Sequence, residues 1–517
     1  MKDIENEGRI GVLTDKSRVT RTVKEGEAEN RTRARRIFRN FGFLTGGKAL
    51  GDVLTVLLFV VLSRAFGQEG IGQYSFAMAL TGFFAIFADF GLYELSIKEM
   101  SRRTSSLKDY YSGILSLRII LSATVFGILL LVLPFLSFPT ETKLVIALIG
   151  GYQILYTLLW GLLAVFVARE DMHLAGLLEF SLRVVIALAG LAVVAAGGSL
   201  VIASAAFPVV TFVHLLVAYG IVANKYGRPK LIGSWSFFTR RLFEAVPYAL
   251  SLFFSQTATR MDIVLLGFFL GAAAAGVYNV AYRVVFFLLF LPAFAAVALF
   301  PVASKLYATS QKEFEALYHK SLNLVILVTL PAASGLWLVA PALIDLIFGK
   351  TFAESAVILR FLAWLLLLVG LECLIGTFLT SCDRQVERTK SQWTAVWVNV
   401  LANIILIPLF ELKGAAVAAV LSEGLLVILL FLRMRALVRW SWIRSRIALS
   451  AIATAAFCFP LALLPSLPLG VVIPAAVLIY GGTLALFKDF RRNEVSTLLS
   501  LLKRESGKPA STGQKIF

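Results

Sequence analysis

Two ionised side chains, Arg260 and Asp262, lie inside the apolar run "ATRMDIVLLGFFLGA" (258–272). Apolar sequence continues on both sides, so no polar loop is near enough to hold them. Residues two apart on a helix point to nearly opposite sides, so these two cannot neutralise each other. Asp262 shares its helical stripe with serine, threonine and tyrosine, whereas Arg260 shares the other stripe with Gln256. A helix that is polar on two sides is typical of a wall between a hydrated cavity and a neighbouring helix.

Further basic residues in apolar runs could bind an anion. Arg260 and Arg283 each lie ten residues from the same turn, which places both about 15 Å deep in a membrane-spanning helix. A guanidinium stays charged and binds phosphate oxygens in pairs, so arginine at this depth favours a phosphate-bearing ligand. The candidates for a phosphate or glycan cavity are Arg260, Arg283, Arg183, Arg118 and Lys48.

The alternative for these arginines is a structural ion pair with a carboxylate. Asp262, Asp89, Glu244 and Glu372 are the candidates, either as ion-pair partners or as carriers of a coupling ion. Within one helix, the spacing of Lys48 to Asp52 and of Glu179 to Arg183 also permits simple pairing along a face.

The elements that hold these residues are membrane spans. The chain has 517 residues, of which 59% are hydrophobic and 15% are charged, against roughly 25% charged in soluble proteins. Mean hydropathy is +0.84. Segments of about 20 apolar residues predict fourteen spans, at 42–66, 72–95, 110–134, 143–168, 173–197, 200–223, 242–270, 273–300, 320–344, 354–381, 392–410, 413–436, 446–465 and 468–488.

The Lys and Arg residues of the loops predict the orientation. Twenty-one of them fall in loops on one side of the predicted membrane, whereas only Lys143, Lys350 and Lys413 fall on the other. The basic side faces the cytoplasm, which predicts that both termini are cytoplasmic. The net charge of +18 therefore reflects the orientation of the protein in the membrane, and we expect no nucleic-acid partner.

An internal repeat divides the spans into two sets. "FGQEGIGQYSFA" (66–77) and "LGAAAAGVYNVA" (270–281) share Gly-x4-Gly-x-Tyr-x2-Ala at an offset of 204 residues, each at the turn after an odd-numbered span. This indicates duplication of a six-span unit in parallel orientation. The predicted fold is an all-α polytopic membrane protein, with two six-helix pseudo-symmetric lobes and two extra helices. Its predicted parts are a charged, disordered tail (1–40), a first lobe (41–223), a basic linker (224–241), a second lobe (242–436), and two spans with a basic tail (437–517).

Other chemistries find little support in the sequence. The predicted loops are too short to build the active site of a membrane glycosyltransferase, so we expect no enzyme. Three cysteines and three histidines are scattered without metal-ligand spacing, so no metal is expected. "GFLTGGKA" (42–49) lacks the Ser or Thr of a phosphate-binding loop and does not follow a strand. We expect no cofactor beyond a coupling H⁺ or Na⁺.

Several segments resemble a known family of transporters. They are "LSRAFGQEGIGQYSFAMALTGFFAIFADFGL", "TRMDIVLLGFFLGAAAAGVYNVAYR", "LFPVASKLY", "FGKTFAESAVILRFLAW" and "VNVLANIILIPLFELKGAAVAAVLSE". In this order and spacing they resemble the polysaccharide-unit flippases of the multidrug/oligosaccharidyl-lipid/polysaccharide exporter superfamily. The resemblance places Arg260 and Asp262 in an Arg-x-Asp motif of the seventh span. The basic first-span pattern of the lipid II flippase branch is not found, which argues against a peptidoglycan precursor as cargo.

The resemblance implies a flippase for polyprenyl- or dolichyl-(pyro)phosphate-linked oligosaccharide. Such a protein works in the plasma membrane by alternating access, and its partners would be the lipid-linked oligosaccharide, membrane lipids and other glycan-assembly membrane proteins. One alternative is an ion-coupled multidrug/cation antiporter of the same superfamily, whose cationic cargo the arginines near mid-membrane would repel. The other is a membrane enzyme that uses lipid-linked sugars.

Overall fold

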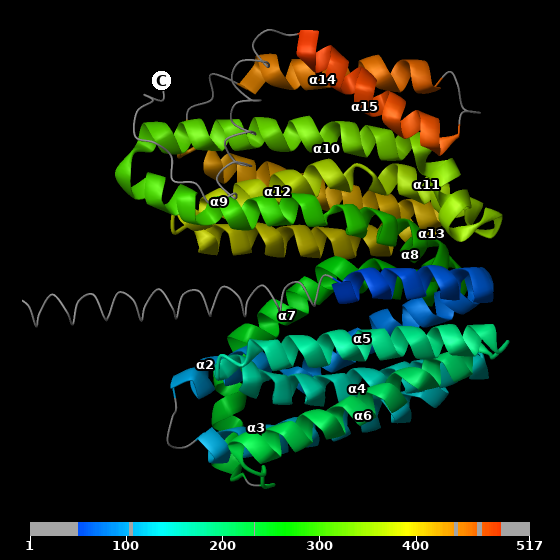
Figure 1. Cartoon of the computed structure of the whole chain (residues 1–517), viewed down its shortest axis with the longest axis vertical. Coiled ribbons are helices and arrows are strands. Elements are labelled where there is room, and N and C mark those ends of the chain that lie inside the picture. Colours follow the sequence, from blue (N-terminus) through cyan, green and yellow to red (C-terminus); the bar gives the residue numbers. More distant parts are fainter. Residues whose placement is uncertain (1–49, 103–106, 232, 439–442, 463–467, 487–517) are drawn as a thin grey trace, which may run out of the picture. The chain divides into compact units, whose positions relative to one another are not determined.

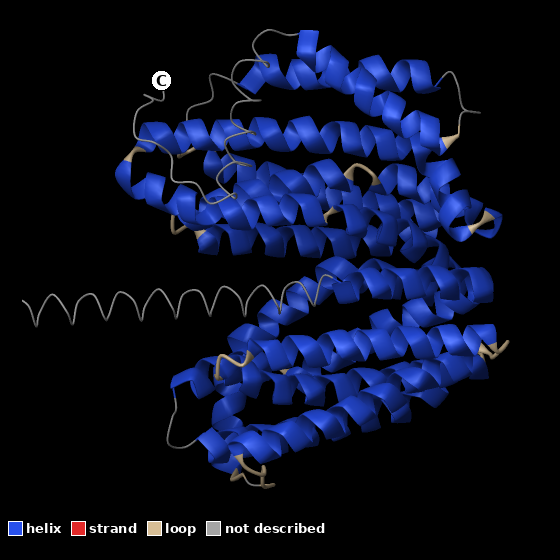
Figure 2. Ribbon diagram, in the orientation of Figure 1, coloured by secondary structure: helices blue, strands red, loops and turns tan. Residues whose placement is uncertain are grey.

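The computed structural model describes residues 50–102, 107–231, 233–438, 443–462 and 468–486. Within these ranges every regular element is a helix (Figure 1 and Figure 2). The predicted all-α fold is therefore confirmed. The predicted tail at 1–40 and the end of the C-terminal tail lie outside the described residues.

The helices follow the predicted apolar segments along the chain. They are a helix over 50–89, α2 (Leu92–Arg102), α3 (Leu107–Val132), η1 (Leu133–Phe135), α4 (Thr140–Ala168), α5 (Met172–Ala195), α6 (Leu200–Tyr226), α7 (Trp235–Phe269), α8 (Ala272–Leu288), α9 (Phe290–Thr309), α10 (Gln311–Phe348), η2 (Lys350–Phe352), α11 (Ala353–Leu362), α12 (Leu365–Ser381), α13 (Gln385–Met434), α14 (Ile443–Ala462) and α15 (Leu469–Leu486).

The described residues include seven helical segments that are long and apolar enough to cross a membrane, or eight if the bent α11–α12 region is one span. Two of them, Leu50–Arg102 and Gln385–Met434, have 53 and 50 residues, although about 20 residues cross a bilayer once. Each contains a backbone break, at Gly67 (φ 64°) and Glu411 (φ 53°). These two breaks lie at turns predicted between spans, so the described helices are roughly consistent with fourteen spans.

The described chain forms two compact units. The first contains residues up to 65 together with 77–256, and the second contains 66–76 together with the residues from 257 onward. The predicted lobe boundaries stay a prediction; relative to them, 66–76 groups with the second unit and the start of α7 with the first.

Each unit has its own helix packing. In the first unit, α4 packs against α2, α3, α5 and α6. In the second, α10 packs against α9, α11, α12 and α14, and α14 packs against α15 (Figure 1). A buried apolar cluster of the second unit includes Phe314, Tyr318, Phe378 and Leu430.

The two copies of the repeated motif meet inside the second unit. A Cβ on Gly72 would lie 1.9 Å from the carbonyl oxygen of Ala272, and a Cβ on Gly276 would lie 2.6 Å from that of Gln68. These two contacts are equivalent, because Gly72 corresponds to Gly276 and Gln68 corresponds to Ala272 at the offset of 204 residues. Small residues at such positions let helix backbones approach closely in membranes. The glycines of the repeat therefore place the two copies face to face.

Candidate functional site

Asp262 lies at the centre of a buried polar network in the second unit. Its two carboxylate oxygens accept hydrogen bonds from the hydroxyl of Tyr278 on α8 and from the side-chain amide of Asn403 on α13, both at 2.8 Å. The amide of Asn403 also contacts the backbone carbonyl of Asn399 at 2.9 Å. Asn399 in turn donates to Ser422 at 3.1 Å. The network thus joins α7, α8 and both halves of α13.

Local sequence explains why these side chains meet. Asn399 and Asn403 are four residues apart on one helix, so they share one face. Tyr278 belongs to the repeated motif, whose close glycine contact sets the start of α8. A polar group inside a membrane needs a partner from its own protein, and here each of these side chains has at least one, although the Oδ1 atom of Asn403 accepts no hydrogen bond. Asp262 therefore pairs with neighbouring helices, on the opposite side of α7 from Arg260.

The structure brings Arg260 and Arg283 together around one tyrosine. Both arginines are partly buried. The ring of Tyr282 on α8 lies within electrostatic range of both guanidinium groups and of Asp262 and Glu423. Both guanidinium groups also act on the buried Tyr74 of the first motif copy. Two cations from adjacent helices, α7 and α8, thus lie in the same region of the second unit as the carboxylates of Asp262 and Glu423.

Glu372 takes part in a different group on the same unit. Its carboxylate accepts hydrogen bonds from Arg388 at 3.1 Å and from Gln392 at 3.3 Å. Glu423 on α13 lies within electrostatic range of Glu372. Glu372 therefore pairs with an arginine from the start of α13.

In the first unit, Arg183 bridges two carboxylates. Its guanidinium donates to Asp52 at 2.7 Å and to Glu179 at 2.8 Å. The Glu179 contact is the pair that the spacing of four residues predicts. The hydroxyl of Tyr156 lies 3.4 Å from the same carboxylate. Arg183 is 16% exposed, so one edge of the cluster remains open.

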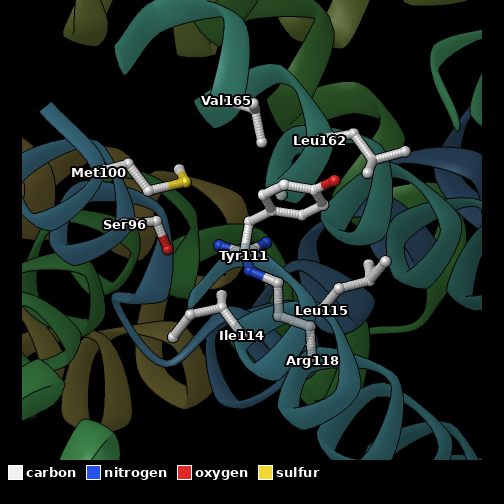
Figure 3. Close-up of a pocket in the computed structure, with 9 residues that line it drawn as sticks. Ser96, Met100, Tyr111, Ile114, Leu115, Arg118, Leu162 and Val165 are labelled. Atoms are coloured by element: carbon white, nitrogen blue, oxygen red, sulfur yellow. The ribbon is translucent and has the colours of Figure 1, made fainter. Parts of the chain in front are cut away.

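Arg118 is fully buried in the first unit. It donates to Asp89 at 2.6 Å and to the backbone carbonyl of Thr157 at 2.7 Å. Gly161 gives it room, because a Cβ there would lie 2.8 Å from its Cδ. The guanidinium lies beside Tyr111 at a cavity of about 10 Å³ (Figure 3), about the smallest space that holds one water molecule. This geometry suits a structural cation better than a ligand-binding one.

Glu244 and Lys48 complete the predicted set. Glu244 on α7 pairs within its own helix with Arg240, at 3.0 Å, and with Arg241. It belongs to the first unit, whereas Arg260 belongs to the second. Lys48 lies outside the described residues, so its predicted pairing with Asp52 is not described. Asp52 itself binds Arg183.

A model of one protein family matches residues 37–307, more than half of the chain, and the description of this family is polysaccharide biosynthesis protein. The chain belongs to this polysaccharide biosynthesis protein family.

Two relatives of this family member have names that refer to glycans. A probable low-salt glycan biosynthesis flippase, Agl15, from Haloferax volcanii is 24% identical over 72% of the present chain and 78% of its own. The capsular polysaccharide biosynthesis protein CapF from Staphylococcus aureus is 22% identical over 74% of the present chain and 96% of its own.

Solved structures show the same fold. The lipid II flippase MurJ in an inward closed conformation superposes with a TM-score of 0.72 and 14% identity, over 87% of the present chain and 99% of its own. An inward-facing multidrug resistance transporter of the MATE family gives a TM-score of 0.55 and 16% identity, over 78% and 96%. The present chain is therefore a multi-pass membrane protein of this fold.

Several residues of the site escaped prediction from sequence. Asn403 binds Asp262 and Asn399, Asn399 binds Ser422, and Arg388 binds Glu372. The asparagine pair had a readable signal, because two amides four residues apart in an apolar span need a polar partner. Arg388 had no such signal, because it lies in a predicted loop, where basic residues commonly set the orientation of the protein in the membrane.

Proposed function

We propose that this protein is a flippase that moves polyprenyl- or dolichyl-(pyro)phosphate-linked oligosaccharide from the cytoplasmic to the outer leaflet by alternating access. Membership of the polysaccharide biosynthesis family supports the cargo class. The names of two Haloferax volcanii relatives, both probable flippases, support the activity. On this proposal the protein is a transporter and not an enzyme, it works in the plasma membrane with both termini in the cytoplasm, and it works beside other glycan-assembly proteins.

The observation that carries the proposal is that Arg260 and Arg283, partly buried on the adjacent helices α7 and α8, both lie within electrostatic range of Tyr282 and Tyr74. Two guanidinium groups on adjacent helices can hold a phosphate or pyrophosphate through several charge-assisted hydrogen bonds. Two carboxylates lie within electrostatic range of the same tyrosine: Asp262 is hydrogen-bonded to Tyr278 and Asn403, and Glu423 lies within range of Glu372. A cationic drug would meet these two guanidinium groups as well as the carboxylates, and a hydrogen-bonded Asp262 is less available to it, which favours an anionic cargo over an antiporter's cation.

The first-unit cations take secondary places in this proposal. Arg183 is partly exposed and already bridges two carboxylates, so it would meet cargo only at the open edge of its cluster. Arg118 is held by Asp89 and Thr157 in full burial and serves the fold. Lys48 keeps its predicted role as a basic residue near the cargo.

Asp262 is the proposed site of ion coupling. Its carboxylate accepts from the hydroxyl of Tyr278 and the amide of Asn403, and Asn403 links it through Asn399 to the hydroxyl of Ser422. Carboxylate, amide and hydroxyl oxygens are the ligands that hard cations take, and a carboxylate can also carry a proton. Either H⁺ or Na⁺ would replace part of the hydrogen-bond network when it binds.

Reconstitution into liposomes tests the proposed activity. A fluorescent polyprenyl-pyrophosphate oligosaccharide is placed in the inner leaflet, and its appearance in the outer leaflet is followed with an impermeant quencher. We expect transfer in protein-containing liposomes and none in empty ones. A prenyl glycoside without phosphate serves as the matched cargo control and should move at least about tenfold more slowly, the factor for roughly 1.5–3 kcal/mol of lost charged hydrogen bonds. Absence of transfer for every lipid-linked glycan would contradict the proposal and favour the antiporter.

A further inference from the structure

An apolar groove opens on the first unit between α3, α4 and α6. Its volume is about 220 Å³, below the roughly 300–1,000 Å³ of pockets that enclose a whole small molecule. Its walls are aliphatic and include Ile119 from α3, Leu158 from α4 and Leu216 from α6. A space of this size and lining fits one stretch of hydrocarbon chain.

One end of the groove is formed by the segment that follows α6, where Pro229 and Lys230 line it. The hydroxyl of Tyr111 donates a hydrogen bond to the carbonyl of Gly227, and the backbone N–H of Lys230 donates to Ser112 at 3.2 Å. Both acceptor and donor side chains come from α3, so the segment is fixed to that helix at two points. Pro229 restricts the backbone between them. The groove end is therefore a defined part of the fold.

Basic side chains gather at this end. Lys108, Arg228 and Lys230 are all exposed. The side chain of Lys108 runs along the backbone of Gly227, where a Cβ would lie 3.3 Å from its Cδ. Asp109, beside Lys108, is the acidic neighbour of this group. These three cations outnumber Asp109, and the nearby Asp171 is already paired with Lys225, so the end of the groove is attractive to an anionic group.

We propose that this groove binds one anionic phospholipid of the surrounding bilayer. An acyl chain lies between α3, α4 and α6, and the phosphate lies at Lys230 with Lys108 and Arg228 beside it. Basic sites between membrane helices recognise anionic head groups in this way. The bound lipid would hold the start of the predicted linker (224–241) against α3.

One feature favours a bilayer phospholipid over the carrier lipid of the proposed cargo. The groove residues Ile119, Leu216 and Tyr219 are 39%, 54% and 40% exposed, as expected of a face that bulk lipid reaches. The loop charges also predict that this end of the unit faces the cytoplasm, whose leaflet carries the anionic phospholipids.

Native mass spectrometry of the full-length protein in neutral detergent tests the proposal without any transport assay. Phosphatidylglycerol and phosphatidylcholine with the same acyl chains are the probes. The variants are Lys230→Ala, which removes the head-group contact, and Leu216→Trp, which fills the groove. Their matched controls are Lys312→Ala, an exposed lysine on α10, and Leu188→Trp, a leucine that is 59% exposed on α5.

We expect phosphatidylglycerol to bind more tightly than phosphatidylcholine. Lys230→Ala should weaken phosphatidylglycerol binding about fivefold, the factor that one basic residue at an anionic lipid surface provides. Leu216→Trp should weaken binding of both lipids, and the two controls should bind as the wild type does. Equal binding of the two lipids, or an equal loss in Lys312→Ala, would overturn the proposal. Displacement of phosphatidylglycerol by a sugar-free polyprenyl phosphate would assign the groove to the carrier lipid instead.

Discussion

The network around Asp262 permits a sharp test of whether this carboxylate serves the fold, ion coupling, or both. Asp262→Ala removes the acceptor of two buried hydrogen bonds, from Tyr278 and Asn403. In membrane proteins such bonds contribute about 0.6 kcal/mol on average and at most about 1.7 kcal/mol. The expected loss of unfolding free energy is therefore about 1–3 kcal/mol, less than two fully unpaired groups would cost in a soluble core.

Asp262→Asn is the matched variant, because it keeps shape and hydrogen bonding. Its amide oxygen can accept from Asn403, and its amide nitrogen can donate to the hydroxyl of Tyr278. We expect the free energy of unfolding of Asp262→Asn to lie within about 1 kcal/mol of the wild-type value. Transport by this variant should lose its dependence on H⁺ or Na⁺, because an amide neither titrates nor carries charge.

Thermal unfolding in detergent and transfer rates at several pH and Na⁺ values measure the two properties separately. A folded Asp262→Asn variant with wild-type ion dependence would refute the coupling role. A double-mutant cycle between Asp262→Ala and Asn403→Ala should give a coupling energy of about 0.6–1.7 kcal/mol. A coupling energy near zero would refute the network itself.

Three further predictions concern other parts of the fold. Arg118→Leu removes the arginine partner of Asp89, whose side chain is 14% exposed, so it should cost up to about 3–5 kcal/mol of unfolding free energy, the range for a broken buried pair. The double change with Asp89→Leu should recover most of this in thermal unfolding, and no recovery would contradict the ion pair. Gly72→Val places a side chain against the carbonyl of Ala272, so it should lower the unfolding temperature. Gly127→Ala should leave the unfolding temperature unchanged, because a Cβ at Gly127 meets open space. Equal effects of the two variants would refute the close contact. Burial alone would raise the pKa of Asp171, but hydrogen bonds from Lys225 and Tyr226 outweigh it and hold this pKa below its ordinary value. The stabilisation by Asp171 is therefore complete above its unfolded pKa of about 3.9 and is lost as pH falls through the lower folded pKa. The free energy of unfolding of Asp171→Asn should depend less on pH in that range than that of the wild type. An unchanged pH dependence at acidic pH would refute this.

Much of the fold could be predicted because the membrane restricts it strongly. A span needs a long apolar segment and a closed set of backbone hydrogen bonds, so helices follow hydropathy closely. The repeat was readable for a related reason. Gly72 and Gly276 are fixed by a backbone approach that no larger residue permits, and such a constraint leaves the same residue type at both copies.

The site was less predictable because partner choice depends on packing. Sequence spacing shows that Arg260 and Asp262 cannot pair with each other, but it does not say which helix supplies Asn403 or Arg388. Glu179 and Arg183 lie in one helix, so their pairing was predictable, whereas the second partner of Arg183, Asp52, comes from 131 residues away. Partners that are far apart in the sequence can be identified only from the three-dimensional packing of the helices.

The rate at which Arg260→Ala transfers lipid-linked oligosaccharide shows whether this arginine binds the phosphate of the cargo. Arg360→Ala is its matched control, a partly buried arginine of the same unit whose guanidinium lies 5.1 Å from the ring centre of Trp337. We expect both variants to fold. Arg360→Ala should transfer the fluorescent polyprenyl-pyrophosphate oligosaccharide at the wild-type rate, and Arg260→Ala should be at least about tenfold slower. Wild-type transfer by a folded Arg260→Ala variant would contradict the proposed phosphate contact at the centre of this mechanism.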